Sequence, residues 1–432
     1  MNMKKIKEKR GTVFKIDGPA SIRVLEGAIS ILGSVLKPKE QVVVPRYKSL
    51  VVEFVEDSTI ELRLGSDAKV EAPLEAVIPA EWTMAAESIL SQDSRPLSCM
   101  ILGDVDSGKT AFGTYIANYA VSKGLKVGVI DKDPGQTEIS VPTTIGLSIV
   151  ERPMHSLENA KAVSVRFVGS VSPSNIVQRV VAATKELFDE ALRRGCDLII
   201  INTSGWVNSR RARELKYNVI TTIHPSHLVL IQRTNEVEHL VKPFEKSDIK
   251  IIRVQPSPAV KPKTKEERKA RRESIFKNYF ANAKVRKVSL TSVRLMYSLF
   301  TTGAVLSKED LEKYGREMGL DFIYGEEGRD FLFLVSRGPV EGKAKIEEEM
   351  ARRYGKEEAI LTWPGEEKGL IVGLLGSDLS YLGLGLIREI DYLKKVIELL
   401  TPVEDVISVI QVGLIKLGED FREIAKHDRS PL

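Results

Sequence analysis

Cysteine is scarce in this sequence, because only Cys99 and Cys196 occur among its 432 residues. Both lie in or beside predicted buried strands, and two such residues make neither a disulfide framework nor a set of metal ligands. We therefore expect a cytoplasmic protein. The first ten residues are charged and have no apolar core, so they do not predict a secretory signal peptide.

The sequence also lacks a long hydrophobic run, since its most apolar late stretch, 369–387, is interrupted by Asp378 and several glycines. We therefore expect no membrane span. The net charge is only +5, so any affinity for nucleic acid has to come from local basic clusters. Internal repeats are absent. The length and the composition, with 43% hydrophobic and 28% charged residues, predict a globular protein of two to four domains.

One stretch matches the pattern G-x-x-x-x-G-K-[ST]. It consists of Gly103, Asp104, Val105, Asp106, Ser107, Gly108, Lys109 and Thr110. An apolar stretch before it, 97–102, predicts a buried strand, and 111–123 after it predicts a helix. In this setting the backbone N–H groups surround a phosphate, the lysine contacts the β- and γ-phosphates, and the threonine hydroxyl contacts Mg²⁺. The sequence therefore predicts a loop that binds a nucleoside triphosphate.

The pattern of short segments predicts three domains. Residues 1–93 contain short alternating stretches typical of an all-β domain. Residues 94–297 alternate strands and helices, which predicts a P-loop NTPase domain with a mostly parallel sheet, closed by a strand over 287–296. Residues 298–432 predict a mixed α/β domain for packing or partner binding. The fold class is therefore α/β, with a central P-loop domain between two others.

Two aspartates, Asp131 and Asp133, follow the strand predicted over 126–130. A P-loop enzyme needs a carboxylate near the metal and, if it transfers phosphate to an alcohol, a base for the hydroxyl proton. Asp133 lies further into the loop and is the candidate base, and Asp131 is the candidate metal ligand or its support. The alternative is that both are turn residues before Pro134 and Gly135.

A polar loop with a large aromatic residue, 202–206, follows another predicted strand. Switch-type phosphate enzymes usually carry an aspartate here, whereas this chain has Asn202 and Thr203. Trp206 could stack on a base or a sugar. It could equally belong to the core, because tryptophan is highly buried on average.

A basic segment interrupts the central domain at 256–287. Between 261 and 287, eleven Lys and Arg stand against three Glu. Arg268 and Arg272 are four residues apart on a predicted helix, so both could reach one phosphate site as an arginine lid. The alternative is a solvated helix face. A second cluster comprises Arg210, Arg211, Arg213 and Lys216, and it predicts contact with a phosphate backbone or, again, a solvated helix.

In their order along the chain, these motifs resemble the polynucleotide 5′-hydroxyl kinases. The motifs are the glycine loop, the stretch from Asp133 to Gln136, the stretch 169–173, the stretch from Thr203 to Trp206 and the Arg268–Arg272 pair. Eukaryotic relatives of this family include the kinase subunit of the pre-mRNA cleavage factor and the nucleolar pre-rRNA processing kinase. The resemblance covers most of the chain and also implies the order β domain, kinase domain, C-terminal domain.

The resemblance implies a role for each motif. Lys109 and Thr110 would hold ATP, or another nucleoside triphosphate, together with Mg²⁺ or another divalent cation. Asp133 would activate the 5′-hydroxyl, and Gln136 would contact the phosphate end. The residues expected to hold the terminal nucleotide are Thr203, Gly205 and Trp206, with Ser172 and Ser174 nearby. Arg268, Arg272 or both would supply the lid arginine.

The sequence thus predicts a kinase that transfers a γ-phosphate to the 5′-hydroxyl of RNA, with DNA as a second candidate acceptor. The alternative is a P-loop switch or assembly NTPase that acts on a protein partner. A guanine-specific switch would carry N-K-x-D after a late strand, and residues 231–235 lack it. A binding subunit with a dead kinase site is disfavoured, because every motif residue is present.

Overall fold

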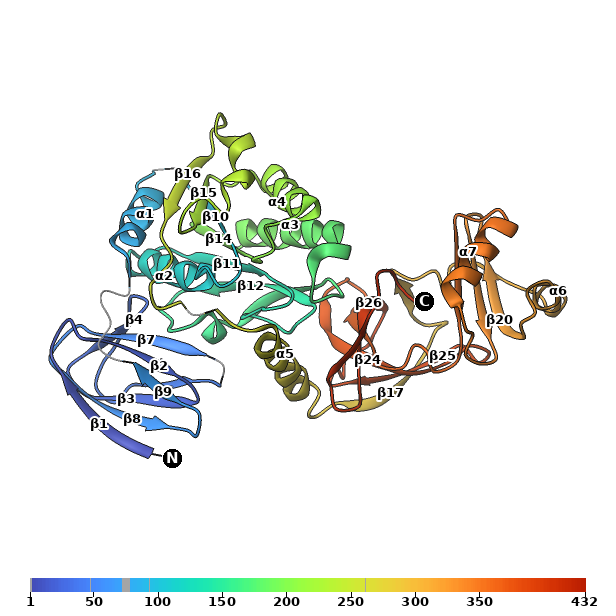
Figure 1. The fold of residues 1–432 in the computed structure, drawn as a ribbon, viewed down its shortest axis with the longest axis horizontal. Coiled ribbons are helices and arrows are strands. Elements are labelled where there is room, and N and C mark those ends of the chain that lie inside the picture. Colours follow the sequence, from blue (N-terminus) through green and yellow to red (C-terminus); the bar gives the residue numbers. More distant parts are fainter. Residues whose placement is uncertain (1, 47, 72–77, 93, 261) are drawn as a thin grey trace. The chain divides into compact units, whose positions relative to one another are not determined.

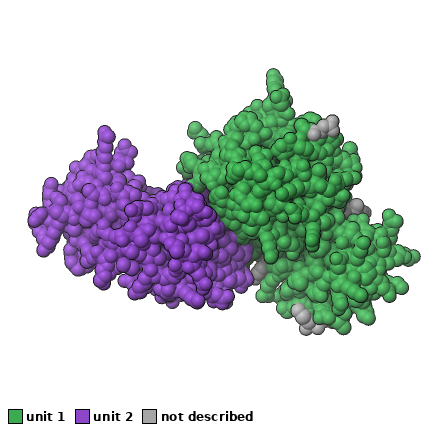
Figure 2. All heavy atoms as spheres, turned by 180° about the vertical axis from the view of Figure 1, so that it is seen from behind, with its two compact units in different colours: residues 1–140, 145–166, 177–271 green, residues 141–144, 167–176, 272–432 purple. Residues whose placement is uncertain are grey.

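The structure is a computed structural model that describes residues 2–46, 48–71, 78–92, 94–260 and 262–432. It divides into two compact units (Figure 2). The first unit comprises residues 1–140, 145–166 and 177–271, and the second comprises residues 141–144, 167–176 and 272–432. The boundary falls inside one helix, α5 (Lys265–Tyr279). The division into three sequence domains stays a prediction.

The N-terminal part of the first unit consists of two sheets that pack around one apolar core. One sheet has the strand order β1-β8-β3-β6 and the other β5-β4-β7-β2-β9. Buried and more exposed residues alternate along β3 and β8, which explains why the alternation of apolar and polar residues in the sequence predicts short strands here. The strands are β1 (Asn2–Glu8), β2 (Val13–Asp17), β3 (Ala20–Glu26), β4 (Ile29–Ile31), β5 (Ser34–Leu36), β6 (Gln41–Val44), β7 (Ser49–Phe54), β8 (Ser58–Leu64) and β9 (Lys69–Glu71).

A mostly parallel sheet forms the rest of the first unit, which confirms the predicted fold class. Its order is β13-β12-β11-β14-β10-β15-β16, and β12 runs antiparallel to β11. The antiparallel strand β12 is missing from the sequence prediction. The strands are β10 (Leu97–Gly103), β11 (Val127–Lys132), β12 (Thr144–Val150), β13 (Ala162–Phe167), β14 (Leu198–Thr203), β15 (His227–Ile231) and β16 (Lys250–Val254).

Helices cover both faces of this sheet. Figure 1 shows α1 (Ala80–Leu90) and α2 (Lys109–Ser122) on one face and α3 (Val177–Arg193) and α4 (Arg210–Ile223) on the other. α2 ends just before Gly124, whose φ of 80° suits a helix C-terminus. The parallel strands β10, β11 and β14 end at one edge, where loops from both faces meet.

The second unit contains two further sheets. Their orders are β17-β25-β24-β23-β26-β18, with β27 beside β26, and β19-β20-β21-β22. Helices α6 (Lys308–Met318) and α7 (Lys343–Arg353) pack on the second of these sheets. The strands are β17 (Lys284–Ser289), β18 (Arg294–Met296), β19 (Ala304–Val305), β20 (Phe322–Glu327), β21 (Phe331–Ser336), β22 (Glu358–Thr362), β23 (Leu370–Leu375), β24 (Tyr381–Asp391), β25 (Val396–Thr401), β26 (Val409–Leu417) and β27 (Glu423–Lys426).

One predicted element of the central domain is wrong. The strand predicted over 287–296 is two strands, because a turn at 290–293 separates β17 from β18. β17 pairs with β25 and β18 pairs with β26, so both belong to the sheet of the second unit. A local alternation of residues identifies a strand but not its partner. Within the described part of the chain, no helix is long and apolar enough to span a bilayer.

Candidate active site

The loop between β10 and α2 has the backbone of a phosphate-binding loop. Two of its residues are left-handed, Asp106 at φ 54° and Gly108 at φ 88°. Glycine is favoured at position 103, since a Cβ there would lie 2.9 Å from the backbone carbonyl oxygen of Ile231 and 2.4 Å from the Ser107 hydroxyl oxygen. α2 begins at Lys109, so its unpaired N–H groups and its dipole adjoin the loop. Such an N-terminus binds phosphate.

The side chain of Lys109 is buried and forms hydrogen bonds with other residues of the phosphate-binding loop. Its ammonium donates to the carbonyl oxygen of Asp104 at 2.5 Å and to the Ser107 hydroxyl at 3.3 Å. Burial lowers the pKa of Lys109 to about 8, although the carboxylates of Asp133, Asp104 and Asp106 act to raise it. These contacts keep the ammonium inside the loop, where the lysine of a P-loop meets phosphate oxygens.

Beside the phosphate-binding loop, three side chains from α2, β11 and β14 meet. The amide nitrogen of Asn202 donates to Thr110 Oγ1 at 3.2 Å and to Asp131 Oδ1 at 3.1 Å. Asp131 is completely buried, and burial raises its pKa to about 7. Asn202 Oδ1 is also buried and makes no hydrogen bond within the described part of the chain.

These three residues fit a magnesium ion. A hydroxyl, a carboxylate and an unpartnered amide oxygen are the hard oxygen ligands that Mg²⁺ prefers, and phosphate oxygens usually complete such a site. The described residues contain no cluster of three or more His, Cys, Asp or Glu side chains that could hold a metal. A divalent cation would therefore depend on Thr110, Asp131 and Asn202 together with the nucleotide. Asn202 replaces the aspartate that switch enzymes carry here.

Asp133 closes a turn and still has one carboxylate oxygen available. Its Oδ1 accepts hydrogen bonds from the N–H groups of Gly135 and Gln136, each at 3.0 Å. Its Oδ2 makes no hydrogen bond within the described residues, and the side chain is half-buried. Asp133 can therefore be both a turn residue and a catalytic base, because one carboxylate oxygen holds the turn and the other is available to accept a proton. The catalytic role of Asp133 stays a prediction.

A buried group of charges holds the segment that follows Asp133. Arg271, 7% exposed, forms ion pairs with Glu158 at 2.8 Å and with Glu138 at 3.2 Å. Its guanidinium also donates to the carbonyl oxygen of Thr137 at 3.3 Å. Lys48, which directly precedes β7, pairs with both glutamates. Burial acts to raise the pKa of Glu138, but Lys48 and Arg271 lower it overall. Arg271 is therefore a structural clamp on the loop that carries Asp133 and Gln136.

The loop from Thr203 to Trp206, which we call the acceptor loop, contacts the phosphate-binding loop. A Cβ on Gly205 would lie 2.6 Å from the backbone N and Cα of Val105, so only glycine allows this approach. Thr203 Oγ1 donates to the carbonyl oxygen of Ile101 in β10 at 2.8 Å. Trp206 is half-buried, so it is not one of the fully buried core residues, and part of its side chain reaches solvent. Its role in stacking stays a prediction.

One residue of the second basic cluster lies inside the protein. Arg210, Arg211 and Arg213 are exposed on α4, whereas Lys216 is completely buried. The inclusion of Lys216 in a basic surface is therefore wrong. α4 buries one face along its length, including Ala212, and Lys216 lies four residues further along that face.

The start of α5 is tied to the phosphate-binding loop. Arg268 donates to Asp106 Oδ2 at 3.1 Å, and the backbone N–H of Lys263 donates to the same oxygen at 2.8 Å. Arg268 also donates to the carbonyl oxygen of Lys263 at 2.7 Å. Lys261, part of the predicted lid, lies outside the described residues. Arg268 is thus the predicted lid arginine that the structure brings to the loop.

Three predicted site residues belong to the second unit. Arg272 donates to both carboxylate oxygens of Glu423, at 2.5 and 3.1 Å. The hydroxyls of Ser172 and Ser174 lie 3.1 Å apart, beside a single turn of 3₁₀ helix. Their roles in catalysis and in acceptor binding stay predictions.

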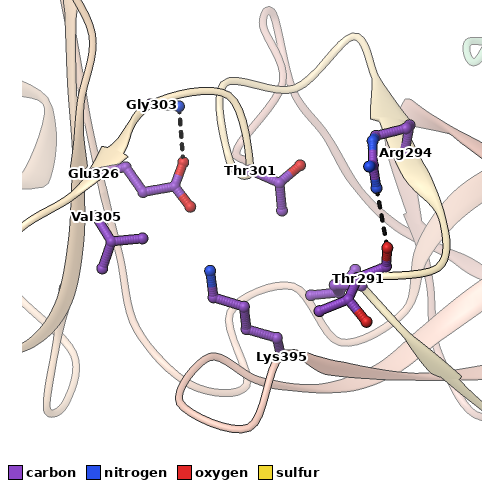
Figure 3. Close-up of a pocket in the computed structure, with 8 residues that line it drawn as sticks. Thr291, Arg294, Thr301, Gly303, Val305, Glu326 and Lys395 are labelled. Carbon is purple, nitrogen blue, oxygen red and sulfur yellow. Dashed lines mark hydrogen bonds between the residues drawn. The ribbon is translucent and has the colours of Figure 1, made fainter.

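The second unit also contains a cavity of about 300 Å³ (Figure 3). The amine of Lys395 points into it, and Thr301 and Arg294 line its rim. The carboxylate of Glu326 accepts the N–H of Gly303 at 3.1 Å. None of the motifs from the sequence lies in this cavity.

Sequence reasoning missed three residues of the site. The sequence shows Asn202 only as a residue that stands where switch enzymes carry an aspartate. In the structure it lies opposite Asp131 in the neighbouring strand, and its side chain hydrogen-bonds to Thr110. Arg271 lies between the two predicted lid arginines in the sequence, but it holds the loop after β11 through its ion pairs with Glu138 and Glu158. Lys216 looks like one more surface charge. A helical count of α4 against its apolar positions is the signal that would have found its burial.

The comparisons with known proteins agree with this geometry. Residues 103–282 match the family model described as the P-loop of the mRNA cleavage and polyadenylation factor CLP1. The chain is 30% identical to a polyribonucleotide 5′-hydroxyl-kinase of Pyrococcus furiosus, over 84% of this chain and 99% of the relative. It is 31% identical to the polyribonucleotide 5′-hydroxyl-kinase of Methanocaldococcus jannaschii, over 80% of this chain and 94% of the relative.

A solved structure of a Clp1p–Pcf11p complex has the same fold. The match has a TM-score of 0.65 at 14% identity and covers 96% of this chain and 98% of the other. The sequence relatives and the site geometry together show the family. The chain belongs to the polyribonucleotide 5′-hydroxyl-kinases of the CLP1 P-loop family, a family of nucleotide-binding kinases.

Proposed function

We propose that this protein transfers the γ-phosphate of ATP to the 5′-hydroxyl end of RNA. The observation that carries the proposal is that the phosphate-binding loop, Asp133 and the acceptor loop adjoin one another. β11 and β14 pair so that Lys132 lies opposite Thr203, which sets Asp133 beside the acceptor loop. A switch NTPase needs no second loop for an acceptor. The names of the archaeal relatives support the same activity.

In this proposal each residue of the site has its own role in phosphate transfer. Asp133 Oδ2 accepts the proton of the 5′-hydroxyl while the hydroxyl oxygen bonds to the γ-phosphorus. The bond from that phosphorus to the β–γ bridging oxygen breaks, and ADP leaves. Lys109 and Arg268 balance the negative charge on the transferred group. Thr110, Asp131 and Asn202 would hold Mg²⁺, which when bound neutralises phosphate charge.

The acceptor strand would lie along exposed basic residues that follow the acceptor loop. Arg210, Arg211 and Arg213 are exposed on the first turn of α4. Contacts between arginine and phosphate release counterions, so acceptor affinity should fall as salt rises. Trp206 would stack on the terminal base, a contact that is worth about 1–3 kcal/mol in other proteins.

Two further proposals concern the setting of the protein. Both thiols, Cys99 and Cys196, are free and buried, which suits a reducing cytoplasm. The fold relative was solved in a complex with Pcf11p. We propose that the C-terminal domain, 298–432, offers surface for a protein partner.

The test is label transfer from γ-labelled ATP, with Mg²⁺, to a 5′-hydroxyl oligonucleotide. RNA and DNA of one sequence are compared, and a 5′-phosphorylated RNA serves as the blank. We expect Lys109→Ala to abolish transfer because it removes the charge inside the loop. Lys123→Ala, at the exposed end of α2, is the matched control and should act as wild type. Release of free phosphate without label on the strand would favour a switch NTPase instead.

A further inference from the structure

Lys216 is a lysine in a place that normally excludes charge. Its side chain is completely buried in α4, and burial lowers its pKa well below the usual range. No ion pair is formed by its ammonium within the described residues. Two other lysines, Lys132 and Lys109, repel it, and Asp133 is the acidic group that attracts it. A buried amine without an ion pair is costly in either protonation state, so stability alone would favour an apolar residue here.

Both hydrogen bonds that Lys216 makes within the described part of the chain go to the acceptor loop. Its ammonium donates to Thr203 Oγ1 at 3.0 Å and to the carbonyl oxygen of Ser204 at 2.7 Å. Thr203 Oγ1 in turn donates to Ile101 in β10. Lys216 therefore links the helix behind the sheet to the loop and, through the threonine, to the strand that leads into the phosphate-binding loop.

The next residue of the loop is held by packing. Gly205 lies against Val105 so closely that a side chain could not be inserted. Thr203, Ser204 and Gly205 are thus fixed one after another. Trp206 is the first residue of the loop whose side chain is half-buried and makes no hydrogen bond within the described part of the chain. The three residues before Trp206 therefore fix the backbone from which its ring projects.

We infer that Lys216 is a positioning residue for the acceptor strand: it holds the acceptor loop so that Trp206 presents its ring to the terminal base. The inference rests on the proposed function, because it requires a strand to bind at this loop. Lys216 itself touches no reacting atom in this arrangement. Its removal should weaken acceptor binding while ATP binding stays as it is.

The experiment compares the wild type with Lys216→Met, which nearly keeps the length of the side chain and removes the amine that makes the hydrogen bonds. Lys246→Met is the matched control, since Lys246 is exposed in the same unit. Binding of a 5′-hydroxyl RNA oligonucleotide is followed without ATP by tryptophan fluorescence, and Trp206→Phe identifies the signal of that ring. The KM values for ATP and for the oligonucleotide and the melting temperature are then measured.

For Lys216→Met we expect an increase of about tenfold in the Kd and KM for the oligonucleotide, the size of one weakened stacking contact. The KM for ATP should change less than twofold. The melting temperature should be unchanged or higher, because a buried amine without an ion pair is replaced by an apolar group. Lys246→Met should match the wild type in all four measurements.

Several results would overturn the inference. Wild-type affinity for the oligonucleotide in Lys216→Met would do so, as would an equal rise in both KM values together with a lower melting temperature. Failure of the wild type to give any Trp206 signal would also overturn it. Failure of the kinase proposal is distinguishable: the Trp206 signal would respond to Lys216→Met, while no label reached the strand.

Discussion

The two halves of the proposed site are built in different ways. The donor half is a run of eight consecutive residues, 103–110, whose backbone forms the phosphate site. The acceptor half combines the loop after β11, the loop after β14 and the start of α5. These segments are held by buried charged contacts, such as those of Arg271 and Lys216.

This difference matters for how each half tolerates change. A backbone site depends on a few glycines and on one helix N-terminus, so its geometry is local. The acceptor half depends on polar side chains that have left water, and around Arg271 the loss of one ionic partner leaves another charge buried. We therefore expect variants of the acceptor half to alter strand binding or the chemical step while nucleotide binding survives.

The largest effect within the acceptor half is expected at Asp133. Asp133→Asn keeps an Oδ1 acceptor for the N–H groups of Gly135 and Gln136, so the turn should remain. It removes the base, and we expect kcat to fall about 10³-fold with an unchanged KM for ATP. The measurement is label transfer under saturating RNA. A fall of only a few-fold would mean that another group accepts the proton.

A smaller effect is expected at Arg268, which joins the two halves through Asp106. Arg268→Gln should lower kcat about 10²-fold, because one charge donor to the transferred phosphate is lost. Lys265→Gln, exposed in the first turn of α5, is the control. Asp106→Asn removes the ion pair but keeps the arginine, so it should cost less than Arg268→Gln. Equal losses would indicate that the pair is only structural.

Much of the fold is visible in the sequence because it is coded by local patterns. Strand β10, helix α2 and the loop between them follow from an apolar run and a glycine pattern. Helix α6 follows a capping box at Ser307 and Asp310 and is capped at its end by Gly319, so local residues mark both of its ends. The partner of a strand is not coded locally, which is why β17 and β18 are assigned to the wrong sheet.

The site divides in the same way. The donor residues are contiguous and can be identified by spacing alone. Arg271 and Arg272 are adjacent basic residues, yet one pairs with Glu138 and Glu158 and the other with Glu423. Nothing in the local pattern separates them, because their partners lie far away in the chain. Only the register of a helix against a folded surface decides which arginine reaches which acid.

The smallest of these effects on activity should come from Arg271, which supports the acceptor half without touching a substrate. Arg271→Met leaves Glu138 and Glu158 with Lys48 as their cation, and breaking a buried pair costs about 3–5 kcal/mol. We expect a lower melting temperature, a KM for the oligonucleotide about tenfold higher and an unchanged KM for ATP. Arg194→Met removes an exposed pair with Glu190 and serves as the control. If the KM for ATP rises equally, the buried charges support both halves, and the contrast between a local donor site and a distributed acceptor site fails.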